Sequence, residues 1–369
     1  MVDTSPSSRA PEAGILARLG LFGISLLIFL LLLETGLRLV QLAPPNLMFD
    51  AMTNQLHQVH LDSFATLIRD DAALFWSLAP HRVLPEDNPK LRGLISNGAG
   101  LREDGEIPLA KPAGQFRVLF VGDSCTFGFG VTHREAFVDG VEQRLRARFP
   151  DRDIECINAG VPGYSLAQGW AYAQRDGLRY QPDLVVCSFG WNDQRHWSSF
   201  DDLTLMEFAR RATPPGWFGW SEVCRQVWSL SVRMRNPETS NKVVRVSAPT
   251  FARLLQEMDA LCTAHGARFI PMVWPLEANV KKSAAGWTPY QRATALFQPT
   301  PRRDGPAVID LLPAIERGLM NGLQVRDLFM DGVHTTERGH AYMADRIADE
   351  LAWWLTEVPS AEPPDPVLD

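Results

Sequence analysis

From residue 116 onward, short apolar runs alternate with longer amphipathic stretches. The apolar runs are bounded by turn or polar residues and predict buried strands of a parallel sheet. The predicted strands are residues 116–121, 153–158, 183–189, 267–273 and 307–310, and the predicted helices are 134–149, 165–178, 247–265, 311–320 and 336–355. Strands that alternate with helices imply right-handed crossovers, so the pattern predicts an α/β domain whose sheet is covered on both faces.

One stretch of about fifty residues, between the third and fourth predicted strands, interrupts this alternation. Residues 195–246 are rich in Trp, Arg and Pro and include the run PPGWFGW. Two interpretations stay open. The insertion is either a helical excursion packed by Trp217, Trp220 and Trp228, or a lid that shapes the substrate site, because long connections at the carboxyl edge of a parallel sheet border the usual ligand crevice.

An apolar segment near the N-terminus has the length of a membrane span. Residues 19–33 carry no charge, and continuation to Val40 gives 22 residues. As a helix they would be roughly 33 Å long, which matches the hydrocarbon core of a bilayer. Glu34 and Arg38 stand at i and i+4 and can pair at the far interface. No small-x-small cleavage site follows, which favours an anchor at 19–40 over a cleaved signal peptide or a core or interfacial helix.

The charges beside this segment favour one orientation. Arg9 and Arg18 precede it and only Arg38 follows closely, so the positive-inside bias places residues 1–18 in the cytoplasm. We therefore expect a single-pass protein of the inner, cytoplasmic membrane with its main body on the periplasmic or extracytoplasmic side. Residues 41–113, rich in Pro and polar side chains, are expected to form a connecting and packing segment, and residues 357–369 a flexible tail.

Composition and charge narrow the classes of function. The chain has 369 residues, 46% hydrophobic and 21% charged, which is typical of a globular protein and excludes a disordered, collagen-like or coiled-coil chain. Its net charge is −7 and it contains no Lys/Arg run, so we do not expect nucleic acid as a partner. The five cysteines form no CxxC pair, and nothing in the sequence indicates a metal site or a cofactor.

Polar and glycine-rich motifs follow four of the five predicted strands. GDSCTFGFG follows the first strand, NAGVPGYS the second, GWND the third and DGVHTTERGH the fifth. In an open parallel sheet all four would lie at the edge where ligand sites form. A serine in a Gly-rich strand-to-helix turn is by itself more often a helix cap than a nucleophile. The inference of a catalytic site therefore rests on the combination.

The order GDS, N-x-G-x-x-G, G-x-N-D and D-x-x-H resembles the SGNH superfamily, also called the GDSL hydrolases, over about residues 114–356. The resemblance implies a three-layer α/β/α flavodoxin-like domain with a five-stranded parallel sheet, which hydrolyses esters through a serine. It also implies the site residues: Ser124, Asp331 and His334 as the catalytic triad, and Ser124, Gly163 and Asn192 as the oxyanion hole.

Other features bear on the subgroup and the substrate. The stretch SNGAGLR and the apolar N-terminal segment resemble a membrane-anchored bacterial subgroup. Cys125 replaces the Leu of GDSL, Trp191 stands in the G-x-N-D block, and Thr335 stands where Pro is common. These departures leave the substrate open and do not affect the chemistry.

The residue types support the same roles independently. A serine hydroxyl needs a base, and imidazole is the side chain that exchanges a proton near neutral pH. Asp331, three residues before His334, can turn back to fix the ring, and Gly163 has no side chain to obstruct a substrate oxygen. His340 is an alternative candidate for the base. Its neighbours, however, predict that it lies at the start of the last helix.

Other polar residues near the motifs are expected to be structural. Asp123 is expected to cap the helix after the first strand, and Asn158 and Asp193 to brace loops. His196 is expected on a surface loop.

Three functions stay open at this point. The first is a membrane-anchored serine esterase that removes an acyl group from a carbohydrate or another small ester. The second is an O-acyltransferase that passes the acyl group to a polysaccharide, and the third is a non-catalytic binding or scaffold module of the same fold. The complete set of nucleophile, base and oxyanion positions favours the esterase. The expected partners are the ester substrate and the membrane, and no pattern indicates a protein partner.

Overall fold

The computed structural model describes residues 12–40, 66–84, 93–212, 216–237, 239–282, 286–299 and 304–357. Residues 1–11, 41–65 and 358–369, which hold parts of the expected cytoplasmic terminus, connecting segment and tail, lie outside the described residues. The chain divides into two units. The smaller comprises residues 1–46 and 207–237, and the larger comprises residues 47–206 and 238–369.

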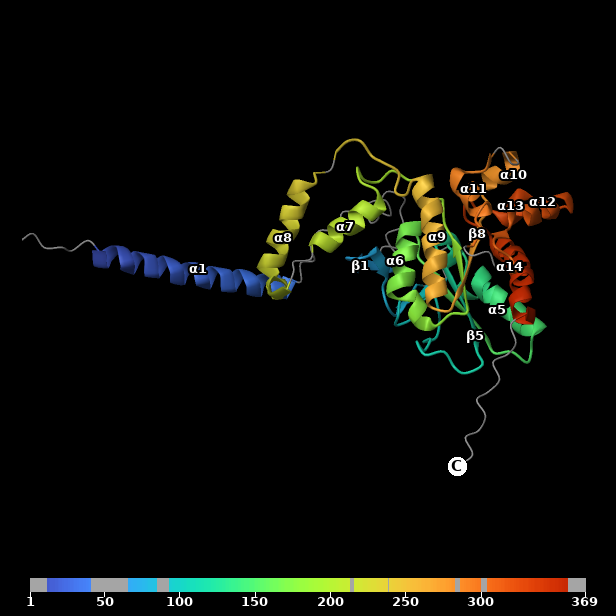
Figure 1. The fold of residues 1–369 in the computed structure, drawn as a ribbon, viewed down its shortest axis with the longest axis horizontal. Coiled ribbons are helices and arrows are strands. Elements are labelled where there is room, and N and C mark those ends of the chain that lie inside the picture. The colour runs from blue at the N-terminus through green and yellow to red at the C-terminus, as the bar shows by residue number, and fades with distance from the viewer. Residues whose placement is uncertain are drawn as a thin grey trace, which may run out of the picture. The chain divides into compact units, whose positions relative to one another are not determined.

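The larger unit is built on a five-stranded parallel sheet (Figure 1). Its spatial order is β6 (Ile154–Gly160), β5 (Phe116–Gly122), β7 (Leu184–Ser188), β8 (Arg268–Val273) and β9 (Ile309–Asp310). Every neighbouring pair is parallel. The predicted flavodoxin-like order is therefore confirmed. β9 is shorter than the predicted strand at 307–310, because only Ile309 and Asp310 pair with β8.

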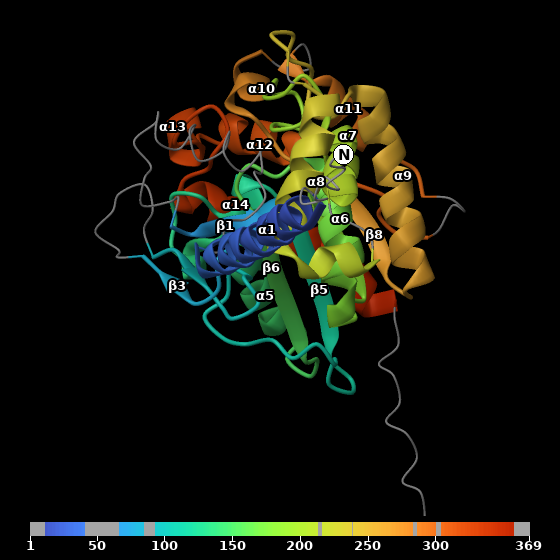
Figure 2. The ribbon, with the colours of Figure 1, turned by 90° about the vertical axis from the view of Figure 1, so that its left-hand side faces the viewer.

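Helices cover both faces of this sheet (Figures 1 and 2). α5 (Phe137–Arg148) and α14 (Glu337–Glu357) pack on one face, whereas α6 (Leu166–Arg175), α9 (Ala248–Ala264) and α11 (Pro289–Ala295) pack on the other. All seven residues of β5 are buried, because the strand lies inside the sheet with helices on both sides. The three-layer α/β/α prediction is thus confirmed.

Further helices connect these elements along the chain. They are α4 (Ser124–Phe127), α7 (Asp202–Ala212), α10 (Glu277–Lys282), α12 (Leu312–Met320) and α13 (Val325–Leu328). The insertion, which includes α7, lies between β7 and β8 along the chain, as the sequence predicts. The residues of α7 from Glu207 onward belong to the smaller unit.

Two antiparallel hairpins precede the sheet, where the sequence indicated no regular pattern. β1 (Ile68–Asp71) pairs with β2 (Phe75–Leu78), and β3 (Arg82–Val83) pairs with β4 (Ile95–Ser96). Strands of two to four residues are too short to show an alternation of apolar and polar positions. The Trp76 ring of β2 is fully buried, and its Nε1 donates to the carbonyl oxygen of Pro162 at 3.0 Å.

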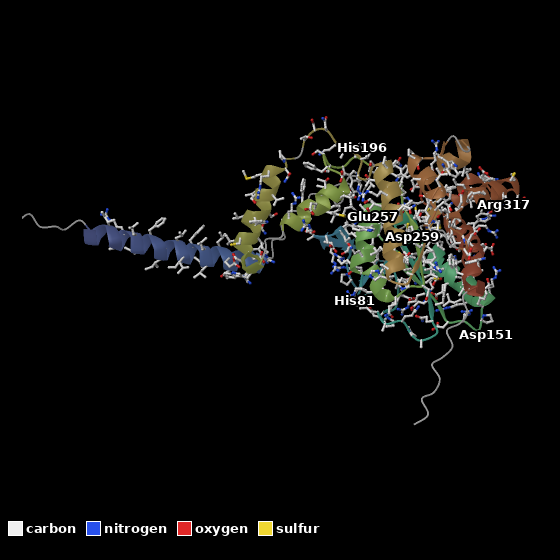
Figure 3. All side chains as sticks on the ribbon, viewed as in Figure 1. His81, Asp151, His196, Glu257, Asp259 and Arg317 are labelled. Atoms are coloured by element: carbon white, nitrogen blue, oxygen red, sulfur yellow. The ribbon has the colours of Figure 1, made fainter. Side chains whose placement is uncertain are left out.

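The smaller unit contains α1 (Glu12–Val40) and α8 (Glu222–Arg235). Residues Ala17–Val40 of α1 form a helix that is long and apolar enough to cross a membrane, with a mean hydropathy of 2.2, and none of its most apolar stretch is buried. Most of its side chains are exposed along the helix (Figure 3). The helix begins earlier than the predicted segment at residue 19.

The close packing at the end of β6 yields a stability prediction. A Cβ added at Gly160 would lie 2.2 Å from the backbone nitrogen of Phe127 in α4. Because backbone cannot move aside as a side chain can, Gly160→Ala should destabilise the fold by about 1–3 kcal/mol or more. Chemical denaturation of the full chain in detergent measures the loss.

Gly105→Ala is the matched control, because a Cβ at Gly105 meets nothing within 4 Å. Equal free energies of unfolding for the two variants would contradict the packing argument.

Candidate functional site

Ser124 is placed by the turn that joins β5 to α4. Asp123 caps α4, since its Oδ1 accepts a hydrogen bond from the backbone N–H of Cys125 at 2.9 Å. Ser124 is therefore the first residue of a helix that begins directly at the strand's carboxyl end, and it is only 8% exposed. The expected capping role of Asp123 is confirmed.

The D-x-x-H segment brings two further predicted residues to this serine. His334 Nε2 lies 2.9 Å from Ser124 Oγ, and His334 Nδ1 lies 2.7 Å from Asp331 Oδ2. The backbone N–H groups of Val333 and His334 both donate to Asp331 Oδ1, at 2.8 and 2.7 Å. This turn holds the carboxylate against Nδ1 of His334, which favours the ring proton on Nδ1. Nε2 is then the acceptor for the hydroxyl proton of Ser124.

The surroundings of Asp331 favour the charged form of its carboxyl group. Partial burial alone would raise its pKa, but the hydrogen bond from His334, the charge of that ring and the two backbone donors outweigh burial and lower the pKa to about 2. The carboxylate thus stays ionised well below neutral pH. Phe129 packs beside that ring, with centroids 4.8 Å apart.

Asn192 contacts Asp123 and the residue that follows Gly163. Asn192 Nδ2 donates to Asp123 Oδ2 at 3.2 Å and to the carbonyl oxygen of Tyr164 at 3.1 Å. Gly163 has a φ of +82°, a backbone conformation that residues other than glycine rarely adopt. Because both amide protons of Asn192 are engaged, a substrate oxygen must replace one of these acceptors to bind this amide.

A buried ion pair braces the Gly163 turn from the insertion. Arg245 pairs with Asp202 at 2.8 Å, and both side chains are almost fully buried. Arg245 Nη1 donates to the carbonyl oxygen of Gly163 at 2.6 Å, and its guanidinium lies 4.4 Å from the ring centroid of Trp197. The sequence analysis did not single out Arg245 or Asp202, since neither stands in a motif.

Asp193 and Asn158 brace neighbouring loops, as the sequence analysis expected. Asp193 accepts from the backbone N–H groups of Leu166 and Gly190, both at 2.9 Å. Asn158 Nδ2 donates to the carbonyl oxygen of Thr126 at 3.1 Å, which ties β6 to α4.

The other histidines considered from the sequence are placed differently from His334. His340 is buried in α14, where its Nδ1 accepts from the backbone N–H of Phe137 at 3.2 Å. Burial, with the charges of Arg102 and His334, lowers the pKa of His340 to about 3, so it is a neutral structural acceptor. His196 is exposed on the connection after β7 (Figure 3).

A small hollow, partly open to solvent, lies next to the turn that carries Ser124. Asp123 and Cys125, the two neighbours of Ser124, line it, and Trp191, Trp274 and Leu276 form apolar walls. Among the described residues, no group of three or more His, Cys, Asp or Glu side chains could hold a metal ion. The site thus combines a serine hydroxyl in contact with an imidazole and a small hollow with apolar walls.

Comparison with known proteins gives a family match over most of the larger unit. The GDSL-like lipase/acylhydrolase family matches residues 120–342. A comparison with curated proteins finds no match.

Similar solved structures include an alpha/beta hydrolase enzyme from the metagenome of Lake Arreo, Spain. It is 19% identical, with a TM-score of 0.44, and the match covers 66% of this chain and 98% of that chain. A variant of an acetyl xylan esterase from Geobacillus stearothermophilus is 19% identical (TM-score 0.42, 64% and 94% covered). A two-domain esterase active on acetylated mannans is 17% identical (TM-score 0.42, 66% and 50% covered).

The environment of Asp193 yields a prediction on pH. Burial raises the pKa of its carboxyl to about 7, against the opposing effects of the Leu166 N–H and the charge of Arg245. An unfolded Asp titrates near 3.9. Between about pH 4 and 7 the folded state therefore binds more protons, so this contribution to stability is complete below about pH 4 and is lost as the pH rises through 7.

Asp193→Asn cannot ionise, so its melting temperature should fall less between pH 5 and pH 8 than that of the wild type. Thermal unfolding of the full chain in detergent measures the two slopes. Asp151→Asn, at an exposed position (Figure 3), is the control and should keep the wild-type slope. Identical slopes for wild type and Asp193→Asn would contradict the argument.

Proposed function

This chain belongs to the GDSL-like lipase/acylhydrolase family and is an ester-hydrolysing enzyme, and we propose that it acts as a serine esterase through Ser124, His334 and Asp331. One observation carries this proposal. The 2.9 Å contact between Ser124 Oγ and His334 Nε2 continues through the 2.7 Å contact between His334 Nδ1 and Asp331. This is the arrangement that a nucleophile, its base and the partner of the base require.

In the proposed reaction, His334 Nε2 takes the proton of Ser124 as Oγ attacks the ester carbonyl carbon. The carbonyl oxygen becomes an oxyanion, and we assign the Ser124 and Gly163 backbone N–H groups and the Asn192 amide as its donors. His334 then returns the proton to the departing alcohol, which leaves an acyl-serine. Water, deprotonated by the same ring, attacks the acyl-serine, and the released acid and the restored Ser124 hydroxyl complete the cycle.

The engaged amide of Asn192 suits this role. Asp123 Oδ2 accepts one of its protons at 3.2 Å, the longer of its two bonds. Exchange of this acceptor for the oxyanion would let the amide bind the intermediate without turning away from Tyr164. The amide then stays oriented by the Tyr164 carbonyl throughout, which limits reorganisation during the reaction.

We place the acyl group in the hollow beside Ser124, because Trp191, Trp274 and Leu276 offer it apolar walls. The alcohol side of the ester then lies toward solvent, which puts no wall of this hollow against a bulky leaving group such as a carbohydrate. This assignment makes acylated carbohydrates the proposed substrate class.

We also propose that α1 is a retained membrane anchor that holds the catalytic unit on the extracytoplasmic side of the inner membrane. The length and hydropathy of Ala17–Val40 support the anchor, and Arg9 and Arg18 before the span support the orientation. A cleaved signal sequence is the alternative, and the mass of the mature chain distinguishes the two.

Substitution of the proposed triad tests the mechanism. Ser124→Ala and His334→Ala should each abolish most hydrolysis of 4-nitrophenyl acetate, and the double variant should lose little more, because triad members act as a unit. Asn192→Ala should lower kcat by roughly 10²–10³ with KM nearly unchanged, as for loss of one oxyanion donor. Steady-state kinetics with the full chain in detergent give these values.

His265→Ala is the matched control, since His265 is exposed and should leave the rate unchanged. Unchanged melting temperatures show that the variants fold. Full activity of folded Ser124→Ala would remove the serine mechanism.

The fate of the acyl group separates hydrolysis from transfer. We expect water to attack the acyl-serine, so acid release from an acetyl ester should exceed acetyl transfer when an oligosaccharide acceptor is added at modest concentration. Titration of the released acid and mass spectrometry of the acceptor measure the two products. Faster transfer than acid release would instead assign the chain to the O-acyltransferases.

A further inference from the structure

A carboxylate within the apolar helix α1 caps a second helix, α8. Glu34 accepts hydrogen bonds from Ser221 Oγ at 2.9 Å and from the backbone N–H groups of Glu222 and Val223 at 3.0 and 3.1 Å. A helix N-terminus has unpaired N–H groups that favour a negative charge. Glu34 therefore serves as the N-terminal cap of α8, although 187 residues separate it from Ser221.

Arg38 completes this joint between the two helices. Its Nε donates to Glu34 Oε1 at 2.7 Å, and its Nη2 donates to the carbonyl oxygen of Trp220. An ionisable residue in a membrane segment normally faces a partner. Here the partners of Glu34 and Arg38 belong to residues 220–223 of the insertion, so the joint fixes the start of α8 on α1.

α8 carries an apolar stripe that stays exposed. Val223, Val227, Leu230 and Met234 stand at i, i+4, i+7 and i+11, which places them on one face of the helix. Val227, Leu230 and Met234 are 62%, 55% and 75% exposed. The opposite face is the one buried within the protein, since Ser229 and Val232 are only 3% and 8% exposed.

The position of Glu34 and Arg38 along the apolar span of α1 indicates what covers the apolar stripe of α8. Glu34 lies six residues, or about 9 Å, before the end of α1 at Val40. The span Ala17–Val40 is about as long as a bilayer core is thick, so α8 starts near the boundary between acyl chains and headgroups. α8 runs across the axis of α1 rather than alongside it (Figure 1), which is the direction of a helix lying in the membrane plane.

We propose that α8 is a second membrane-binding element, an interfacial helix that inserts Val227, Leu230 and Met234 between lipid acyl chains. Trp220, which is 66% exposed at the start of the helix, lies at the level where indole rings favour the interface. The occupant of the stripe is thus the bilayer that also surrounds α1. This inference rests on the proposed anchoring by α1.

The proposal gives residues 207–237 of the insertion a role other than that of a lid. In the smaller unit this part of the insertion packs with α1. It would bind lipid beside the anchor, whereas Asp202 and Arg245, also within the insertion, brace the Gly163 turn in the larger unit. The two parts of the insertion thus have separate functions.

Spin-label accessibility in vesicles tests the proposal. Single cysteines replace chosen residues in a Cys224→Ser background, because the other four cysteines are buried. The labelled full chain is reconstituted in vesicles of phosphatidylethanolamine and phosphatidylglycerol, and collisions with oxygen and with a nickel chelate are compared. Leu230→Cys and Met234→Cys should show an oxygen-to-nickel ratio several-fold above that of Met320→Cys, an apolar position in the larger unit that is about as exposed as Met234.

Two further positions make the result specific. Arg235→Cys, exposed on another face of α8, should show a lower ratio than Leu230→Cys, whereas Leu27→Cys in α1 should show the highest. A high ratio at position 27 with a water-like ratio at 230 and 234 would overturn the proposal and leave the anchor intact. Labels at 230 and 234 shielded from both reagents would overturn it in favour of a protein partner or a second copy. A water-like ratio at position 27 would instead refute the anchor.

Discussion

The geometry of the candidate active site depends on the close approach of α4 to the carboxyl ends of β5 and β6. A Cβ at Gly122 would lie 2.0 Å from Thr126 Oγ1, and one at Gly160 would lie 2.2 Å from the Phe127 nitrogen. Only glycine at both strand ends lets the four-residue helix sit directly on them. Ser124 thereby projects from a rigid edge of the sheet, and Asp123 is buried close enough to reach Asn192. Both sides of the site are organised around this contact.

Buried polar groups then hold the surrounding loops in one arrangement. Asp193 joins the loops after β6 and β7, and the Arg245–Asp202 pair holds the Gly163 carbonyl. Loss of one partner of a buried ion pair typically costs about 3–5 kcal/mol, because the other charge is left unpaired. Burial also raises the pKa of Asp123 to about 6, against its bond from the Cys125 N–H and the charge of His334. Such groups limit the freedom of the oxyanion side, which suits preorganised donors.

The smaller unit is not stabilised by a packed core as the larger unit is. Its long helix is mostly apolar and exposed, so as the proposed anchor it is stabilised by the bilayer and not by a protein core. The charges of Glu34 and Arg38 are satisfied by backbone groups and a hydroxyl of residues 220–223. In the proposed function, the chain thus combines a packed α/β domain with two helices, α1 and α8, that contact lipid.

The sequence by itself determined the parallel sheet, the helices between its strands and the apolar N-terminal helix, because each is encoded in the periodicity of neighbouring residues. Strand-end positions predicted that the four motifs meet at one edge of the sheet, and the resemblance of these motifs to the SGNH superfamily implied Ser124, Gly163, Asn192, Asp331 and His334 as the site residues. Asp331 and His334 could be paired from their spacing alone. Their catalytic roles remain proposals.

Tertiary structure alone decided the contacts that support these residues. Arg245 lies 82 residues from Gly163, Trp76 lies 86 residues from Pro162, and Glu34 lies 188 residues from Glu222. The short hairpins before the sheet were likewise invisible as patterns. A local period can encode which face of an element is buried, but it cannot encode which distant side chain meets that face. Those contacts form only in the packed chain, where buried hydrogen-bond donors and acceptors from distant segments lie close together and must be paired.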